Sequence, residues 1–205
     1  MSELLLILDS SNKCSNTCFQ GTLTANALKT VLQSSDGDSV RFPSDQEFEE
    51  RILNRPIYQV LAQYKIRAVL EANDQAQADR KSENLELPRD LTIEHVMPMK
   101  WELNWPIPEQ HQADPEAKLK FAQQRNQMVH TLGNLTLITG SLNPSLSNGS
   151  WQKKRPELAK YSKLNLNRYF YPVHEGEDAL VEWNEKTIVK RGRLLFESAS
   201  NVWPY

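Results

Sequence analysis

This sequence of 205 residues has few cysteines and lacks the long apolar runs of membrane proteins. The chain has two cysteines, Cys14 and Cys18, with no second pair of metal ligands near them. This pattern favours two free thiols over a metal site. No run of about 18 apolar residues provides a membrane span. The apolar stretch at 4–8 is short and lacks the basic flank and cleavage site of a secretory signal. We therefore expect a cytoplasmic protein without a membrane association.

An excess of basic charge is also missing. The chain has 24 Lys and Arg against 26 Asp and Glu, which gives a net charge of −2. Proteins that bind nucleic acid tightly on their own usually carry a positive excess, so strong independent binding is not expected. With 39% apolar residues the chain can bury a core. We find no internal repeat or low-complexity segment.

Two short motifs are present instead. The first, at 92–98, is TIEHVMP, an apolar run that ends in Glu94 and His95 and is followed by Pro98. The second, at 133–143, is GNLTLITGSLN, whose alternating residues predict a strand at 135–139. Ser141 can cap a helix with Asn143 in its first turn. We expect strand, long connection, strand and helix to meet at one pocket.

The residue types in these motifs suit phosphodiester hydrolysis. His95 can act as the base, because an imidazole titrates near neutral pH. Glu94 and Asn143 offer oxygen ligands, which suit Mg²⁺, with Mn²⁺ as a substitute, better than zinc. Neighbouring side chains on a strand point to opposite faces, so Glu94 and His95 can share one site only if the strand ends or bends there.

Other residues complete the predicted site. Asn134 is interpreted as an asparagine that braces the loop and the catalytic base, with a plain turn residue as its alternative. His130 is a candidate contact to phosphate. A basic strip formed by Lys153, Lys154 and Arg155 is also predicted to contact DNA phosphates, and a solvated helix face is its alternative.

The motifs resemble those of the HNH nucleases, whose core is two strands and a helix around a metal. The resemblance implies that His95 is the base, Asn134 the central asparagine and Asn143 the helix ligand. The helix ligand here is therefore an asparagine, whereas the last H of the name HNH denotes a histidine at that position. The HNH domains of RNA-guided CRISPR effectors share this departure, and by analogy the metal-binding role is kept.

The segments LTIEHVMP, HTLGNLTLITGSLNPSLSN and WQKKR resemble more closely the C-terminal domain of GmrSD-type restriction enzymes. The similarity extends over roughly residues 40 to 205. It implies a modular anti-phage enzyme in which this domain cuts DNA and an N-terminal domain binds nucleotide. Nothing in the chain resembles that nucleotide-binding half, so we expect it in a separate domain or subunit that acts as a partner.

The remaining sequence is interpreted as scaffold. A capping box at 44–47 precedes a helix, Pro56 opens a second helix that carries Tyr64 on its apolar face, and 74–86 is a polar linker. Asp114 opens a helix that runs to about Met128. Helical spacing predicts a further helix near the C-terminus that packs on the nuclease core. Three tryptophans are expected to be buried anchors of the core more than surfaces on which bases stack: Trp101, Trp105 and Trp151.

The sequence thus predicts an α+β protein, mostly helical, with an HNH-like ββα-metal core packed against flanking helices. We divide it into a helical annex at 1–88, the nuclease core at 89–160 and a C-terminal helical segment at 161–205. The predicted function is Mg²⁺-dependent cleavage or nicking of DNA. The alternatives are a degenerate module that binds nucleic acid or a partner, and a hydrolase of smaller phosphoesters.

Overall fold

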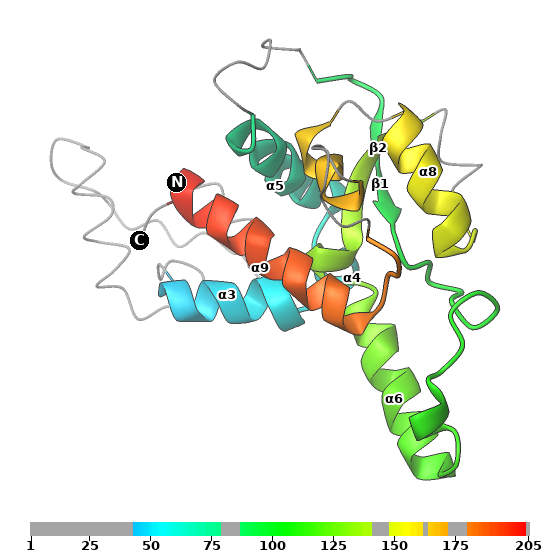
Figure 1. The fold of residues 1–205 in the computed structure, drawn as a ribbon. Coiled ribbons are helices and arrows are strands. Elements are labelled where there is room, and N and C mark those ends of the chain that lie inside the picture. The colour runs from blue at the N-terminus through cyan, green and yellow to red at the C-terminus, as the bar shows by residue number, and fades with distance from the viewer. Residues whose placement is uncertain (1–42, 79–86, 141–147, 162–163, 172–179, 204–205) are drawn as a thin grey trace, which may run out of the picture.

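A computed structural model describes residues 43–78, 87–140, 148–161, 164–171 and 180–203, except for the side chains of 159–161. Figure 1 shows two short strands surrounded by helices. The described part of the chain is therefore mostly helical with a small sheet, which confirms the α+β class. None of the helices within these ranges is both long and apolar enough to cross a bilayer.

The sheet consists of β1 (Leu91–His95) and β2 (Leu135–Thr139), which pair antiparallel. Leu91 lies opposite Thr139, and His95 lies opposite Leu135. Both predicted strands are confirmed. The connection between them contains the 3-10 turns η1 (Glu109–His111) and η2 (Leu132–Asn134) and the helix α6 (Pro115–Met128).

Most predicted helix starts are confirmed. Ser44 caps α3 (Asp45–Asn54) with Glu47 in a capping box. The Asp114 carboxylate accepts hydrogen bonds from the first amides of α6. Near the C-terminus, α9 (Glu185–Val202) begins at Asn184 with a second capping box and buries the predicted apolar face through most of its length. Short polar side chains therefore fix these helix starts locally.

The helix predicted after Pro56 is wrong in its length. The structure has a short α4 (Ile57–Val60), an extended residue at Leu61, and then α5 (Gln63–Ala76). This break rotates the helical register, so Tyr64 is 70% exposed instead of packed in the core. Ile66, Val69 and Leu70 are buried in its place.

The linker predicted from Asp74 is also wrong at its start, while 79–86 lies outside the described residues. Asp74 is on α5 and is buried. Its carboxylate accepts a hydrogen bond from the Leu166 amide at 2.9 Å, in the 3-10 helix η3 (Asn165–Phe170). Burial raises the pKa of Asp74. A charged residue in a polar run is thus part of the interior because a distant backbone amide satisfies it.

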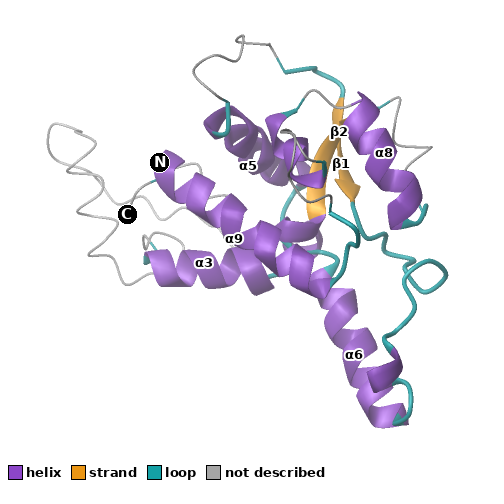
Figure 2. Ribbon diagram, viewed as in Figure 1, coloured by secondary structure: helices purple, strands orange, loops and turns teal. Residues whose placement is uncertain are grey.

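The buried apolar residues form two clusters. One joins α3, α5 and α9 to the sheet side that carries Leu135 and Leu137. The other joins Ile138 and the two residues after β1, Val96 and Met97, to α8 (Trp151–Tyr161), η3 and the start of α9. In Figure 2 the two strands lie between α5 on one side and α8 on the other, with α9 beside them. The end of β1 therefore lies between two apolar clusters.

The tryptophans belong to the second cluster. Trp101, Trp105 and Trp151 are each less than a tenth exposed, which confirms their prediction as buried anchors. Arg125 of α6 lies 4.6 Å from the centre of the Trp101 ring and forms an ion pair with Glu185. These contacts attach α6 to the body of the protein, from which it projects in Figure 1.

Candidate active site

The two residues that end β1 are directed to different neighbours. In the register Glu94 lies opposite Thr136 and His95 lies opposite Leu135. Strand alternation places the two side chains on opposite faces of the sheet. The Glu94 carboxylate contacts α8, whereas the His95 imidazole contacts α4 and the segment after α6. These contacts therefore do not bring the Glu94 carboxylate and the His95 ring together in one pocket.

Glu94 forms a buried ion pair with Lys154. The Lys154 Nζ donates to Glu94 Oε1 at 2.6 Å and to the main-chain oxygen of His95, also at 2.6 Å. The Lys154 residue is 1% exposed and Glu94 is 7% exposed. Burial lowers the pKa of Lys154, and the nearby Glu94 opposes that shift. One ammonium thus neutralises the carboxylate and ties α8 to the last residue of β1.

The basic segment at 153–155 therefore differs from the exposed strip that was predicted. Trp151, Lys154 and Leu158 follow helical spacing, and all three are buried on the inner face of α8. Lys153 is exposed. Arg155 is partly buried and its Nε donates to the Phe170 oxygen at 3.3 Å. The spacing of Trp151 and Leu158 is the sequence signal that indicates an inward Lys154.

His95 lies in an aromatic environment. Its Nε2 is 3.4 Å from Nδ1 of His130, and the edge of the Tyr58 ring packs on it with 4.3 Å between centroids. Both histidines are less than a tenth exposed. Burial, with smaller contributions from His130 and Lys154, lowers the pKa of His95 to about 3. His95 is therefore neutral near physiological pH, with one ring nitrogen able to accept a proton.

Asn134 braces the loop after β1. Its Nδ2 donates to the main-chain oxygens of Met97 and Val129, and its Oδ1 accepts from the Met97 amide and from Trp183 Nε1. An asparagine amide has two donors and two acceptor positions, so all four are used inside the protein. Asn134 is also fully buried. These contacts support a bracing role for Asn134 and leave its amide nothing to offer a substrate.

Arg191 is a buried cation that the sequence did not reveal as part of this region. Its guanidinium donates to the main-chain oxygens of Gly133 and Leu135 at 2.9 and 2.6 Å. Burial lowers its pKa to about 9, so the group stays charged at neutral pH. A Cβ on Gly133 would lie 2.3 Å from the Ile188 oxygen. The glycine of the second motif therefore allows α9 to pack closely against η2.

Of the two predicted metal ligands, Glu94 lies within the described residues. Asn143, the second predicted ligand, lies outside the described residues, as does the helix start predicted at Ser141. Glu94 supplies oxygen donors that suit Mg²⁺, although Lys154 contacts its Oε1. Within the described ranges, no cluster of three or more His, Cys, Asp or Glu side chains is placed to hold a metal.

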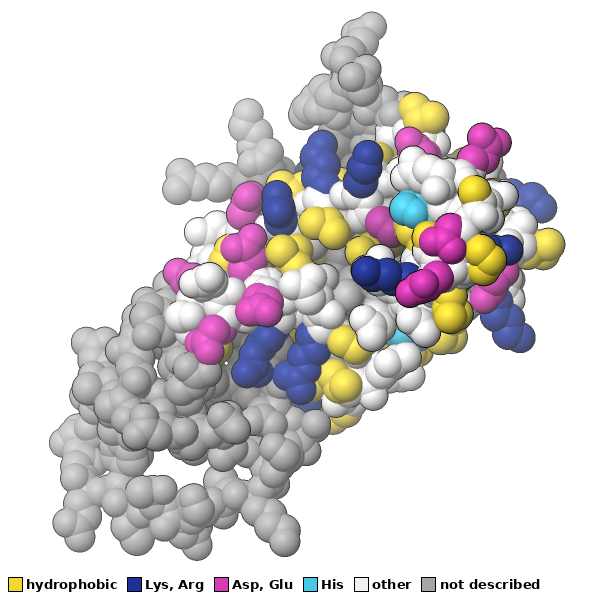
Figure 3. Space-filling view, turned by 90° about the horizontal axis from the view of Figure 1, so that it is seen from below, with side chains coloured by type: hydrophobic (Ala, Val, Ile, Leu, Met, Phe, Trp, Pro, Cys, Tyr) yellow, Lys and Arg dark blue, Asp and Glu magenta, His cyan; other side chains and the backbone are white. Residues whose placement is uncertain are grey.

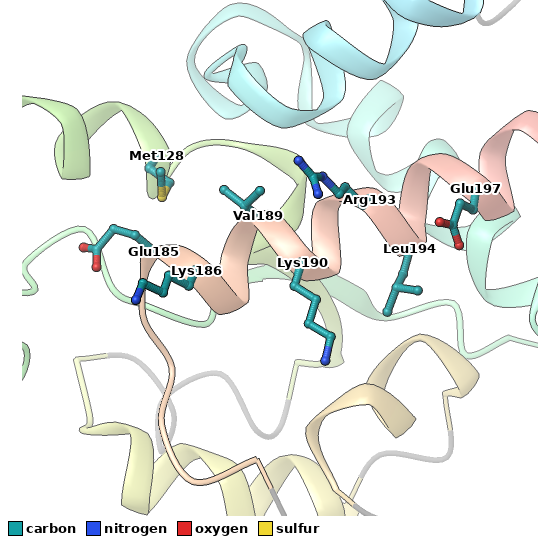
Figure 4. Close-up of a pocket in the computed structure, with 8 residues that line it drawn as sticks. All are labelled: Met128, Glu185, Lys186, Val189, Lys190, Arg193, Leu194 and Glu197. Carbon is teal, nitrogen blue, oxygen red and sulfur yellow. The ribbon is translucent and has the colours of Figure 1, made fainter.

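Two grooves on the described surface lie away from these residues. Figure 4 shows one of about 540 Å³, which runs along the outer face of α9 beside Met128. Another, of about 560 Å³, is lined by residues of the 104–111 segment, α6, α8 and the start of α9. Neither is lined by Glu94, His95, His130 or Lys154. Basic and acidic side chains are interspersed on the face in Figure 3.

The fold and this region define a mostly helical α+β protein with a buried, neutral histidine at the end of a two-stranded sheet. A family model described as the C-terminal domain of GmrSD restriction endonucleases matches residues 42–198. The chain belongs to this family, which confirms the resemblance found in its motifs. No curated protein matches the sequence. Family membership indicates the nuclease module of a restriction endonuclease.

Proposed function

We propose that this chain is a metal-dependent DNA endonuclease of the HNH type, which acts as the nuclease module of a GmrSD-like restriction system against phage. The observation that carries the proposal is the neutral, buried His95 at the end of β1 in a chain of this family. In this proposal β1, β2 and the helix expected from Ser141 correspond to the ββα core.

His95 is the general base of the proposed reaction. A neutral imidazole takes a proton from water, which then attacks the phosphorus in line with the leaving 3′ oxygen. Asn134 holds the loop at Met97 next to the base through its four hydrogen bonds. The products would carry a 5′ phosphate.

Magnesium, or manganese in its place, is the proposed cofactor. Glu94 and Asn143 would hold the ion, and the Glu94 carboxylate would have to turn at the end of β1 to reach the side that carries His95. When bound, the ion would neutralise charge on the phosphate and the leaving oxygen. Lys154 balances the charge of Glu94, so Lys153, Arg155 and His130 remain as candidate contacts to phosphate, with Lys153 the most exposed of the three. A contact between Lys154 and phosphate would require this ammonium to leave Glu94.

The proposed partners are DNA and a nucleotide-binding N-terminal domain or subunit. The near balance of charge in this chain, −2 in total, supports a division of labour in which the partner captures DNA. The proposed location is the cytoplasm, where a restriction enzyme meets incoming DNA.

Cleavage of supercoiled plasmid tests the proposal directly. The wild type should nick or linearise plasmid with Mg²⁺ or Mn²⁺, and EDTA should stop it. His95→Ala should lower the rate at least about 100-fold, the usual share of a general base. Asn143→Ala should raise the Mg²⁺ concentration needed for half-maximal rate.

Controls separate the alternatives. His111→Ala removes a histidine outside the site and should leave cleavage unchanged. Hydrolysis of a chromogenic phosphodiester without plasmid cleavage would indicate a hydrolase of small phosphoesters. DNA binding without cleavage under every metal condition would indicate a binding module and reject the nuclease assignment.

A further inference from the structure

The contact between His95 and His130 joins two histidines that are 35 residues apart in the chain. Their rings are perpendicular, with 5.3 Å between centroids, and the Nε2–Nδ1 distance of 3.4 Å is at the long end for a hydrogen bond. Hydrogen bonds at catalytic groups are often long in the free enzyme and tighten when substrate binds. The geometry therefore places Nε2 of His95 next to Nδ1 of His130.

The surrounding backbone fixes His130 in this orientation. His130 is the second residue after α6, and its amide donates to the Gln127 oxygen at 3.1 Å. Its own main-chain oxygen accepts from the Tyr58 amide, also at 3.1 Å. The Tyr58 ring stacks on His130 with 17° between the ring planes and packs edge-on against His95. Tyr58 thus contacts both imidazoles and couples α4 to the segment after α6.

The chemistry of a neutral imidazole limits how the pair can work. One ring nitrogen carries a hydrogen and the other a lone pair, and a hydrogen bond to one nitrogen decides which is which. If His95 Nε2 carried the lone pair, that lone pair would point at His130. For His95 to act as a base toward water, Nε2 must carry the hydrogen and Nδ1 the lone pair.

We propose that His130 is a positioning residue, whose Nδ1 accepts a hydrogen bond from Nε2–H of His95 and so holds His95 in the tautomer with a basic Nδ1. This inference rests on the proposed role of His95 as the general base. It gives His130 a function other than the phosphate contact expected from the sequence. The placement of His130 Nδ1 beside His95 Nε2 supports it, because this nitrogen is then directed at the imidazole and not at a phosphate.

Substitution of His130 tests this role through kcat. In His130→Phe the acceptor is lost, and kcat should fall about 10- to 100-fold, the loss that follows removal of the orienting partners of metal-bound histidines. KM and the affinity for DNA should stay near wild type. In His130→Asn the amide oxygen replaces Nδ1 as acceptor, and most of the wild-type kcat should return. The same two substitutions at His111 are the matched controls and should leave both constants unchanged.

The tautomer of His95 provides a readout independent of activity. Long-range ¹⁵N–¹H correlation spectra should show Nε2–H at His95 in the wild type and in His130→Asn, and a changed tautomer population in His130→Phe. An unchanged tautomer in His130→Phe would overturn the inference, as would a raised KM at constant kcat, which indicates a phosphate contact. Equal loss of kcat in both variants would also overturn it and would indicate that His130 itself carries a proton.

The two proposals can fail separately. If the wild type cuts no DNA with any metal, the proposed nuclease function fails, and the ¹⁵N spectra still decide whether His130 sets the tautomer of His95. If the wild type cuts DNA and His130→Phe is fully active, the nuclease function stands and the positioning role is rejected.

Discussion

Glu94 and His95 are consecutive residues, yet the surroundings of their side chains are opposite in character. On one side of β1 the Glu94 carboxylate and the Lys154 ammonium form a buried pair. On the other side His95 is neutral and packs against two aromatic rings, Tyr58 and His130. Strand alternation produces this division, since neighbouring residues face opposite sides of a sheet. One strand end can therefore present a buried ion pair on one side and a neutral imidazole on the other.

The two sides of β1 also differ in how they contribute to the stability of the folded protein. A buried charge pair contributes little net stability, but removal of one partner leaves the other charge without compensation. A neutral imidazole carries no such penalty while it stays unprotonated. The two sides should therefore respond differently to substitution and to pH.

The largest expected effect comes from Lys154→Met, which leaves Glu94 buried without a cation. The free energy of unfolding should fall by about 3–5 kcal/mol, measured by urea denaturation. Lys153→Met, one residue earlier and exposed, is the matched control and should change stability by no more than about 0.5 kcal/mol. In the double variant Glu94→Gln with Lys154→Met, much of the loss should be recovered. Equal stability of the two single variants would show that Lys154 is not buried in solution.

The sequence predicted the local elements of this region well. Both strands follow from their apolar runs, and the starts of α3 and α6 follow from Ser44 and Asp114, because a capping side chain acts within three residues of itself. The family was predicted from short motifs for a similar reason, since each motif is contiguous in the chain.

What the sequence could not predict depends on contacts between distant segments. Asp74 is buried because the Leu166 amide meets it, and Tyr58 and His130 reach His95 only once α4 and α6 are in place. No proline or glycine lies at the break between α4 and α5, so the sequence does not indicate this break. Lys154 lies between these two cases. Its helical spacing from Trp151 and Leu158 indicates a buried side chain, whereas the basic residues beside it in the sequence favour an exposed strip.

A smaller effect is expected from pH on the His95 side. Burial holds the pKa of His95 at about 3 in the folded protein, below its value of about 6.5 in the unfolded chain. The unfolded state therefore binds more protons between these values, and the stability that His95 contributes is lost as pH falls below about 6.5.

The His95→Gln variant isolates this contribution. Between about pH 7 and pH 4.5, the free energy of unfolding of the wild type should fall more than that of His95→Gln, by at most about 2.5 kcal/mol, since each pH unit is worth about 1.4 kcal/mol per proton. Groups distant from His95, such as Asp74, are common to both proteins and cancel in the comparison. Parallel pH curves for the two proteins would contradict a neutral His95.

The smallest expected effect distinguishes Lys153 from Lys154 in DNA binding. Removal of one contact to phosphate makes the dependence of the logarithm of affinity on the logarithm of salt concentration shallower by about 0.9. Because Lys153 is exposed and Lys154 is bonded to Glu94, Lys153→Gln should reduce this slope, and Lys154→Gln should leave it unchanged. The loss of affinity should be equal for modified and unmodified DNA, since phosphate contacts carry no sequence information. Fluorescence anisotropy across a salt series measures both slopes. A shallower slope in Lys154→Gln would mean that the ammonium leaves Glu94 when DNA binds, so that the charged side of β1 rearranges on binding.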